Sequence, residues 1–176
     1  MADWKGFEIR RATLDDAALL TELARRLFVQ TFADANEPDN MDSYLASAFT
    51  VEKQTAELSD VDRLTFIAES DGAAIGYAML CRGRRATGVV ADSPAELQRI
   101  YVDARWHGHG VGDALMNGCR EQARAWACDL LWLGVWQENP RAVAFYKRSG
   151  FSTVGEQTFM LGRDLQMDFV MARPLR

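Results

Sequence analysis

The sequence is poor in the residues that build metal centres and disulfide frameworks. Its 176 residues include only two histidines, His107 and His109, and three cysteines. The histidines lie two positions apart, with no cysteine or carboxylate at metal-ligand spacing, so we expect no metal site. The cysteines, Cys81, Cys119 and Cys128, are odd in number and fall within expected helices and strands. They therefore indicate reduced, buried thiols and a cytoplasmic protein.

Long apolar runs and an excess of basic charge are missing too. No apolar run reaches the roughly 18 residues that a membrane helix needs, and residues 1–5 lack the apolar stretch of a signal peptide. We therefore expect no membrane partner. The net charge of −5 argues against nucleic acid and is compatible with a cationic substrate. The length predicts a single domain, residues 1–176, with a core large enough to fold alone.

Residues 96–126 are the most informative stretch, and they predict a strand, a glycine-rich turn and a helix. Residues 96–102 have the apolar and β-branched content of a buried strand, and apolar residues recur at helical spacing after residue 111. Between them, Gly108, Gly110 and Gly112 occupy every second position. Glycine permits unusual backbone conformations, and the first N–H groups of a helix attract anions. The turn therefore predicts an anion site, most often for phosphate; a glycine turn without a ligand is the alternative.

Two common phosphate motifs are excluded at this turn. No Lys-Ser/Thr pair follows the last glycine, which excludes a P-loop. The spacing is Gly-x-Gly-x-Gly, and no acidic residue ends a second strand about 20 residues later, which excludes a dinucleotide-binding fold.

Hydrophobic periodicity and turn residues predict the other elements. Residues 130–136 are nearly all apolar, which is typical of a strand buried on both faces in a parallel or central position. A helix is predicted to follow this strand. Asn139 is its N-cap, Pro140 its first residue, and Gly150 ends it. The remaining predictions are strands at residues 6–11, 63–69, 73–81, 151–161 and 166–174, and helices that start at Thr13, residue 42 and Thr50, with residues 30–40 breaking the first helix.

The glycine turn also resembles a known family. A strand, then Gln/Arg-x-x-Gly-x-Gly/Ala, then a helix is similar to the coenzyme A pyrophosphate loop of the GNAT N-acetyltransferases. We align the motif to residues 107–112, with His107 where the family usually has Gln or Arg. A register that starts at Arg105 also fits the letters. We prefer the first register because Gly112 then opens the helix.

A second segment resembles the same family. The signature Asn-x-x-Ala-x-x-Phe-Tyr-x-x-x-Gly-Phe is matched at Asn139, Ala142, Phe145, Tyr146, Gly150 and Phe151. Two signatures in this order, about 30 residues apart, are far more specific than either alone. The resemblance implies an α/β (α+β) fold whose mixed, mostly antiparallel, twisted sheet has about six or seven strands. In this family the sheet is splayed at the cofactor site and flanked by helices.

The resemblance implies transfer of an acetyl group from acetyl-CoA to a small primary amine. Residues 155–168 are similar to the PaiA-like spermidine/spermine acetyltransferase subgroup, which suggests a polyamine. Asp164, Asp168 and the acidic segment 34–42 are candidates to meet its cationic groups, or are ordinary surface residues. Protein N-termini, amino acids and aminoglycosides stay open as acceptors. A non-catalytic acyl-CoA-binding or sensing module and a plain interaction domain are the alternatives of other classes.

The resemblance also assigns site residues. Main-chain groups of the central strand would pair with the cofactor arm, the turn would hold the pyrophosphate, and Asn139 would hydrogen-bond the arm. The implied cofactor contacts are Ile100, Tyr101, Val102, His107, Gly108, His109, Gly110, Val111, Gly112, Asn139 and Phe145.

Tyr146 would act as general acid on the leaving thiolate, because a phenol with a pKa of about 10 stays protonated at neutral pH. Glu96, at the start of the central strand, is our candidate for the general base. A strand-end surface charge is the alternative for Glu96, and Tyr101 and His109 are further candidates for the base. Many relatives form dimers, so we expect a homodimer, with the exposed edge of the final hairpin as the contact.

Overall fold

A computed structural model describes residues 6–175, so the expectation about residues 1–5 lies outside the described part of the chain. The strands are β1 (Glu8–Arg11), β2 (Arg63–Ser70), β3 (Ala73–Arg82), β4 (Pro94–Val102), β5 (Leu130–Trp136), β6 (Ser152–Leu161) and β7 (Asp164–Pro174). The helices are α1 (Ala17–Phe32), α2 (Pro38–Ala48), α3 (Val51–Ser59), α4 (Val111–Ala125) and α5 (Pro140–Arg148).

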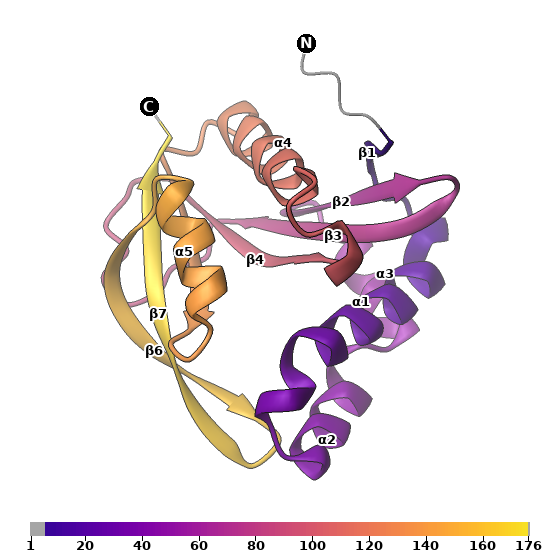
Figure 1. The fold of residues 1–176 in the computed structure, drawn as a ribbon. Helices are drawn as coiled ribbons and strands as arrows, with labels where there is room; N and C mark the ends of the chain where they lie inside the picture. Colours follow the sequence, from indigo (N-terminus) through magenta and orange to yellow (C-terminus); the bar gives the residue numbers. More distant parts are fainter. Residues whose placement is uncertain (1–5, 176) are drawn as a thin grey trace.

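The seven strands form one mixed sheet in the order β1-β2-β3-β4-β5-β7-β6. Neighbouring strands pair antiparallel except β4 and β5, which are parallel. This arrangement confirms the expected mixed, mostly antiparallel sheet, and it places β5 centrally, as its apolar sequence predicted. Figure 1 shows α4 and α5 on one side of the sheet and α1, α2 and α3 on the other.

Each face of the sheet carries its own hydrophobic core. Under α4 and α5, residues such as Leu115 and Cys119 pack against Leu131 and Met171. On the opposite face, α1 and α2 pack against Ile67 and Tyr77 together with a group of aromatic side chains. All three cysteines are free and buried, as predicted.

The sheet opens between its two central strands. Pairing between β4 and β5 is limited to Pro94–Glu96 of β4, which pair with Leu130–Trp132 of β5. Both strands continue well beyond these residues. An irregularity in the pairing of β3 with β4 leaves Gln98 without a partner on β3 just after this point. The two strands therefore have no ladder of hydrogen bonds between them beyond Glu96 and Trp132. The expected splay is therefore present, and it exposes main-chain groups on both strands.

One boundary in the N-terminal half differs from the predictions. The polar segment 30–40 breaks the first helix as predicted, since α1 ends at Phe32 and a short 3-10 turn follows it. α2 starts at Pro38, four residues earlier than predicted, because proline suits the first turn of a helix, where its missing N–H has no acceptor. The predicted Thr50 cap of α3 is confirmed, since its side chain accepts from Lys53 N at 3.2 Å.

Candidate active site

The glycine turn has the backbone geometry of an anion cradle. Gly108 and Gly110 have φ angles of +82° and +84°, which disfavour any residue with a side chain. No protein atom lies within 4 Å of the position that a Cβ on Gly108 would occupy. The first intrahelical bond runs from Ala114 N to Gly110 O at 3.0 Å. The N–H groups of residues 111–113 therefore have no intrahelical acceptor, and the turn fits a phosphate group.

Our reason for the motif register is wrong. Gly110, not Gly112, is the N-cap of α4, so Gly112 lies inside the first helical turn. A Cβ on Gly112 would be 3.5 Å from the Phe145 ring, which is an ordinary packing distance. The two glycines with positive φ are those of the register that starts at Arg105. Gly108 and Gly110 belong to both registers, so the predicted anion loop itself is unaffected.

His107 and His109 take structural positions in this turn. His107 Nε2 lies 2.8 Å from the carbonyl oxygen of Val102; because a carbonyl can only accept, Nε2 carries the proton. The ring thus ties the turn to the end of β4. His109 Nδ1 lies 3.1 Å from the carbonyl oxygen of His107, and its ring packs edge-on against Trp106. No group of residues suited to hold a metal ion is found within residues 6–175.

Asp103 stabilises the start of the same turn. Its carboxylate is 1% exposed and accepts hydrogen bonds from Arg105 and from Arg26 of α1. These guanidinium groups hold the pKa of Asp103 well below its usual range, chiefly through the hydrogen bond from Arg105. The carboxylate is therefore ionised at neutral pH, and it connects the anion loop to a helix on the other face of the sheet.

The strand residues assigned to the cofactor divide between the two faces. Ile100 and Val102 point their side chains toward the core under α4, whereas Tyr101 faces the core under α1 and α2. Only main-chain groups of this strand are then available to a ligand in the splay, as expected for recognition by an added strand.

The second signature forms α5, which places Tyr146 at the splay. Asn139 caps the helix by accepting a hydrogen bond from Ala142 N at 3.2 Å. Its side-chain oxygen is thereby engaged, and its amide N–H groups are what a ligand could use. Phe145 packs against Gly112 at the start of α4 and 5.4 Å from the Tyr146 ring. The two signatures are therefore in direct contact.

Tyr146 is 9% exposed, and its ring packs edge-on against Phe145 and Phe151. Burial raises the pKa of its hydroxyl above the ordinary value, so the phenol keeps its proton throughout the neutral range. The hydroxyl makes no hydrogen bond to another residue in the described part of the chain. It is thus a protonated donor without a protein acceptor.

The sequence has four tyrosines, and the hydroxyls of the other three lie within electrostatic reach of Tyr101. The ring of Tyr101 lies 5.8 Å from that of Tyr77. The pKa of the Tyr101 hydroxyl is raised by burial first and then by the nearby hydroxyls of Tyr77, Tyr44 and Tyr146. Tyr101 thus lies within electrostatic reach of tyrosines from both cores, Tyr44 and Tyr77 on one face of the sheet and Tyr146 on the other.

Glu96 lies where the splay begins, opposite Trp132 in the last paired positions of β4 and β5. Its side chain is 13% exposed, and Oε2 lies 3.3 Å from Nε of Arg84 without hydrogen-bond geometry. Burial raises the pKa of Glu96, and Arg84 opposes that effect. The sequence interpretation of Glu96 as an exposed strand-end charge is therefore excluded.

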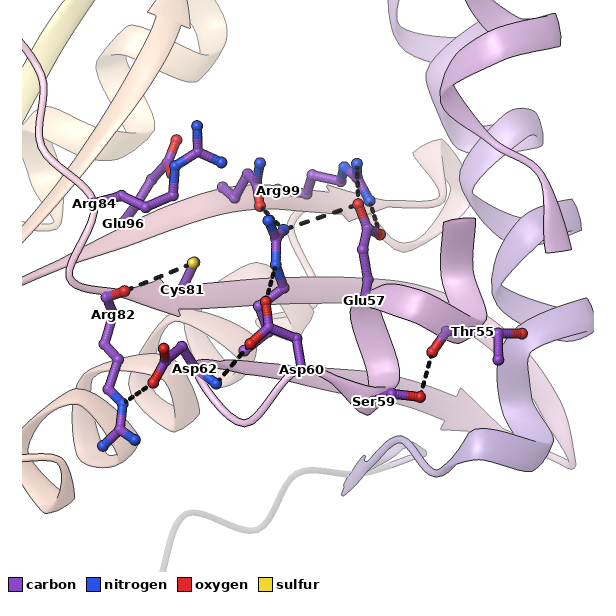
Figure 2. A network of polar contacts seen from close by, with 12 residues as sticks. Thr55, Glu57, Ser59, Asp60, Asp62, Cys81, Arg82, Arg84, Glu96 and Arg99 are labelled. Atoms are coloured by element: carbon purple, nitrogen blue, oxygen red, sulfur yellow. Dashed lines mark hydrogen bonds and ion pairs between the residues drawn. The ribbon is translucent and has the colours of Figure 1, made fainter. Parts of the chain in front are cut away.

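Arg84 and Glu96 belong to a wider set of ion pairs beside β4. In Figure 2, Arg84 and Glu96 lie at one end of this set, and the ion pair between Arg99 and Glu57 lies at the other end. Arg99 donates to both carboxylate oxygens of Glu57, at 2.7 and 3.0 Å. This network fixes α3 against β4 and surrounds Glu96 with positive charge.

A buried carboxylate, Asp168, lies on β7, the strand next to β5 on the side away from the splay. It is 8% exposed and sits opposite Trp136 of β5 in the sheet. Burial raises its pKa to about 6, opposed only by a hydrogen bond from Gln157. The sequence singled out Asp168 as a cation contact, but its burial and its partner Gln157 had no sequence signal, because both depend on the pairing of β6 with β7.

The acidic segment 34–42 and the final hairpin are in contact. Arg163 N donates to the side-chain oxygen of Asn40 at 2.9 Å, and Gln166 donates to that of Asn36 at 2.6 Å. A cavity of about 760 Å³ lies at this junction. It is lined by four carboxylates, from Asp34, Glu37, Asp39 and Asp164, with Arg163 as the one cation among the lining residues. Asp42, which the sequence grouped with them, is exposed outside the cavity.

The sequence profile of the acetyltransferase (GNAT) family matches residues 20–151. The chain belongs to this family. This GNAT protein is an N-acetyltransferase that uses acetyl-CoA as its acetyl donor. The acetyl-CoA co-substrate expected from the sequence is therefore confirmed.

Relatives of this GNAT protein cover most of its length. An uncharacterised N-acetyltransferase of Mycobacterium tuberculosis is 35% identical over 162 residues, which cover 92% of this chain and 99% of the relative. An aminoglycoside N(6')-acetyltransferase of Stenotrophomonas maltophilia is 29% identical over 145 residues, covering 81% and 84%. A spermidine N(1)-acetyltransferase of Thermoplasma acidophilum is 25% identical over 148 residues, covering 82% and 87%.

The fold is shared with solved GNAT structures. PaiA N-acetyltransferase from Thermoplasma acidophilum, crystallised with coenzyme A, matches with a TM-score of 0.76 and 23% identity over 96% of this chain and 98% of that one. Within residues 6–175, no helix has the length and apolar character required to cross a bilayer.

Proposed function

We propose that this GNAT protein acetylates a primary amine of a small molecule that carries several positive charges, such as spermidine or spermine. The observation that supports this proposal is the acidic cavity at the junction of α2 with the β6–β7 turn. With four carboxylates against one guanidinium, it favours a cation. An acceptor with a single charge has no use for a charged cavity remote from the reacting nitrogen.

The cavity and Asp168 lie along the same face of β7. Asp164, Gln166 and Asp168 alternate along the strand and therefore point to one side of the sheet. Asp164 lines the cavity and Asp168 lies opposite Trp136. Their Cα atoms are separated by about 13 Å, given the rise of a strand. A linear polyamine is long enough to place one ammonium in the cavity and another amine in the splay.

Relatives support a polycationic acceptor. One relative is named a spermidine acetyltransferase, and another an aminoglycoside acetyltransferase. Both kinds of molecule carry several amines, so aminoglycosides are the second candidate class. The acidic cavity disfavours free amino acids, whose carboxylate would be repelled there.

The transfer uses Tyr146 as general acid on the leaving thiolate, since it is a buried, protonated phenol without a protein acceptor. Glu96 is the carboxylate that the sequence offers as general base, and it lies partly buried at the start of the splay. The turn at residues 107–112 would hold the pyrophosphate of acetyl-CoA through backbone N–H groups. Asn139 would donate to the cofactor arm.

The experiment is a turnover assay. Purified protein is incubated with acetyl-CoA and spermidine, spermine, an aminoglycoside, an amino acid or an N-terminal peptide, and thiol release is followed. We expect turnover with the polyamines, and with Asp164→Asn an increased KM for spermidine at little changed kcat, because the cavity contributes binding remote from the reaction. Turnover restricted to the amino acid or the peptide would contradict the polycationic acceptor. Acetyl-CoA binding without turnover on any amine would favour the sensing module.

We also propose a homodimer that pairs through the final hairpin. β6 is an edge strand of the sheet. Met160, Leu165 and Met167 expose large apolar side chains on this hairpin, and Leu165 pairs with Met160 across the two strands. An exposed edge next to apolar side chains is a contact surface that proteins usually cover. Light scattering after size exclusion should give twice the chain mass, and Leu165→Lys should give a monomer. A monomeric wild type would contradict the proposal.

A further inference from the structure

Two carboxylates lie on the strands around the splay, partly buried Glu96 on β4 and buried Asp168 on β7, and the sequence singled out only Glu96 as a base. Resting on the proposed amine acetylation, we infer that Asp168, rather than Glu96, accepts the proton of the acceptor ammonium. This assignment names the catalytic base and places the reacting nitrogen over β5, between Asp168 and Tyr146.

Gly134 opens the surface of β5 beside Asp168. It is the exposed residue between buried Leu133 and Val135, in the interior of the sheet. It lies two residues beyond Trp132, the last residue of β5 that pairs with β4, and so it borders the splay. A Cβ at this position would lie 3.3 Å from Oδ2 of Asp168 and would overlap with the side-chain nitrogen of Gln157. The missing side chain leaves room for the Gln157 amide next to Asp168, and the exposed main chain of Gly134 lies beside Oδ2.

Asp168 has no cation of its own. No ion pair within 4 Å involves it in the described part of the chain. Its hydrogen-bond donor is the neutral amide of Gln157 on β6. β5 faces it with Gly134 and Trp136, neither of which titrates. From α2, Tyr44 is the titratable group within its electrostatic reach. A buried carboxylate with a neutral partner favours an incoming cation, which would supply the missing charge.

Glu96 has the opposite surroundings. Arg84 already pairs with it at 3.3 Å, and Arg63 and Arg99 add positive charge. An ammonium that approached Glu96 would meet these three guanidinium groups, which repel it. An ammonium at Asp168 meets an amide, a glycine and aromatic rings. The charge distribution therefore favours Asp168 as the point where a cationic acceptor arrives.

The proton balance of the step is as follows for a primary ammonium. Asp168 takes one proton and leaves a neutral amine, whose lone pair forms the C–N bond to the thioester carbon. The C–S bond breaks, and the thiolate takes the Tyr146 proton. The nitrogen then loses a second proton, which passes through water to the Tyr146 phenolate and restores the phenol. The amide and free thiol result, and the one net proton leaves from Asp168 to solvent.

The test compares two isosteric variants, Asp168→Asn and Glu96→Gln, on the polyamine that the wild type acetylates fastest, spermidine or spermine. For the wild type we expect kcat/KM to fall as the pH drops through about 6, because a protonated Asp168 cannot accept a proton. Asp168→Asn should lower kcat/KM at pH 8 by roughly tenfold or more and remove that inflection. Glu96→Gln should keep the inflection.

Two controls separate catalysis from folding. Glu156→Gln changes the neighbouring residue on β6, whose carboxylate accepts from Gln137, and should leave rate and pH profile unchanged. Asp168→Asn should melt no lower than the wild type at pH 8, because it removes a buried charge without a cationic partner. It should also keep its affinity for acetyl-CoA.

The possible failures are distinguishable. An active wild type whose rate and inflection survive in Asp168→Asn overturns the role of Asp168 and leaves the proposed function in place. If the inflection is lost only in Glu96→Gln, the base is Glu96. That result also overturns the role of Asp168 and leaves the proposed function in place. A wild type that acetylates neither polyamine removes the proposed function and the inference together.

Discussion

Gly108→Ala is expected to weaken acetyl-CoA binding by about a hundredfold. Hydrogen bonds to charged groups contribute about 1.5–3 kcal/mol each, and every 1.4 kcal/mol is a factor of ten in affinity. Gly108 has a φ of +82°, and a Cβ there would contact no protein atom within 4 Å. The methyl group would therefore occupy the space that we assign to the pyrophosphate, and titration calorimetry with acetyl-CoA would measure the loss.

The matched control for that change is Gly72→Ala. Gly72 lies in the β2–β3 turn with a φ of +74°, and a Cβ there also has open space around it. Both substitutions impose the same left-handed strain, about 1–2 kcal/mol of unfolding free energy. Only Gly108→Ala should lose affinity for the donor. Equal affinities for the two variants would contradict the assignment of the turn as the anion site.

Tyr146→Phe is expected to lower kcat by about a hundredfold with little change in KM. A general acid contributes in the range of about 10²–10⁴ in rate, and a hundredfold loss corresponds to about 2.7 kcal/mol of barrier. The hydroxyl makes no hydrogen bond to any other described residue, so its removal should cost the fold little. Steady-state kinetics with saturating acetyl-CoA and the best amine would measure the effect.

Tyr77→Phe provides the control for that loss. The Tyr77 hydroxyl is buried and makes no hydrogen bond within the described part of the chain. Removing it should leave kcat unchanged and raise the unfolding free energy by about 1 kcal/mol, since a buried polar group without a partner is costly. Burial raises the pKa of Tyr146, so no loss of kcat from its ionisation is expected up to pH 9. An unchanged kcat in Tyr146→Phe would remove Tyr146 from the mechanism.

Local sequence determined the elements that carry the two signatures. The glycines at 108 and 110 required a turn that only glycine accommodates, and the apolar run 130–136 required a buried strand. Asn139, Pro140 and Gly150 fixed the ends of α5 because caps act within one helical turn. The choice of motif register was wrong because either Gly110 or Gly112 could cap the helix as far as the sequence shows. Only the backbone geometry identifies Gly110 as the N-cap.

The tertiary structure decided what each charged group in the site can do. Glu96 and Asp168 are both carboxylates in strands, and nothing in their sequence neighbours distinguishes them. Long-range pairing places Arg84 against Glu96, whereas the register of β5, β6 and β7 places Gly134 and Gln157 against Asp168. Burial and partner charge set the affinity of a carboxylate for protons and cations. Both arise from residues far apart in the chain, so the sequence named the candidates and the fold assigned their surroundings.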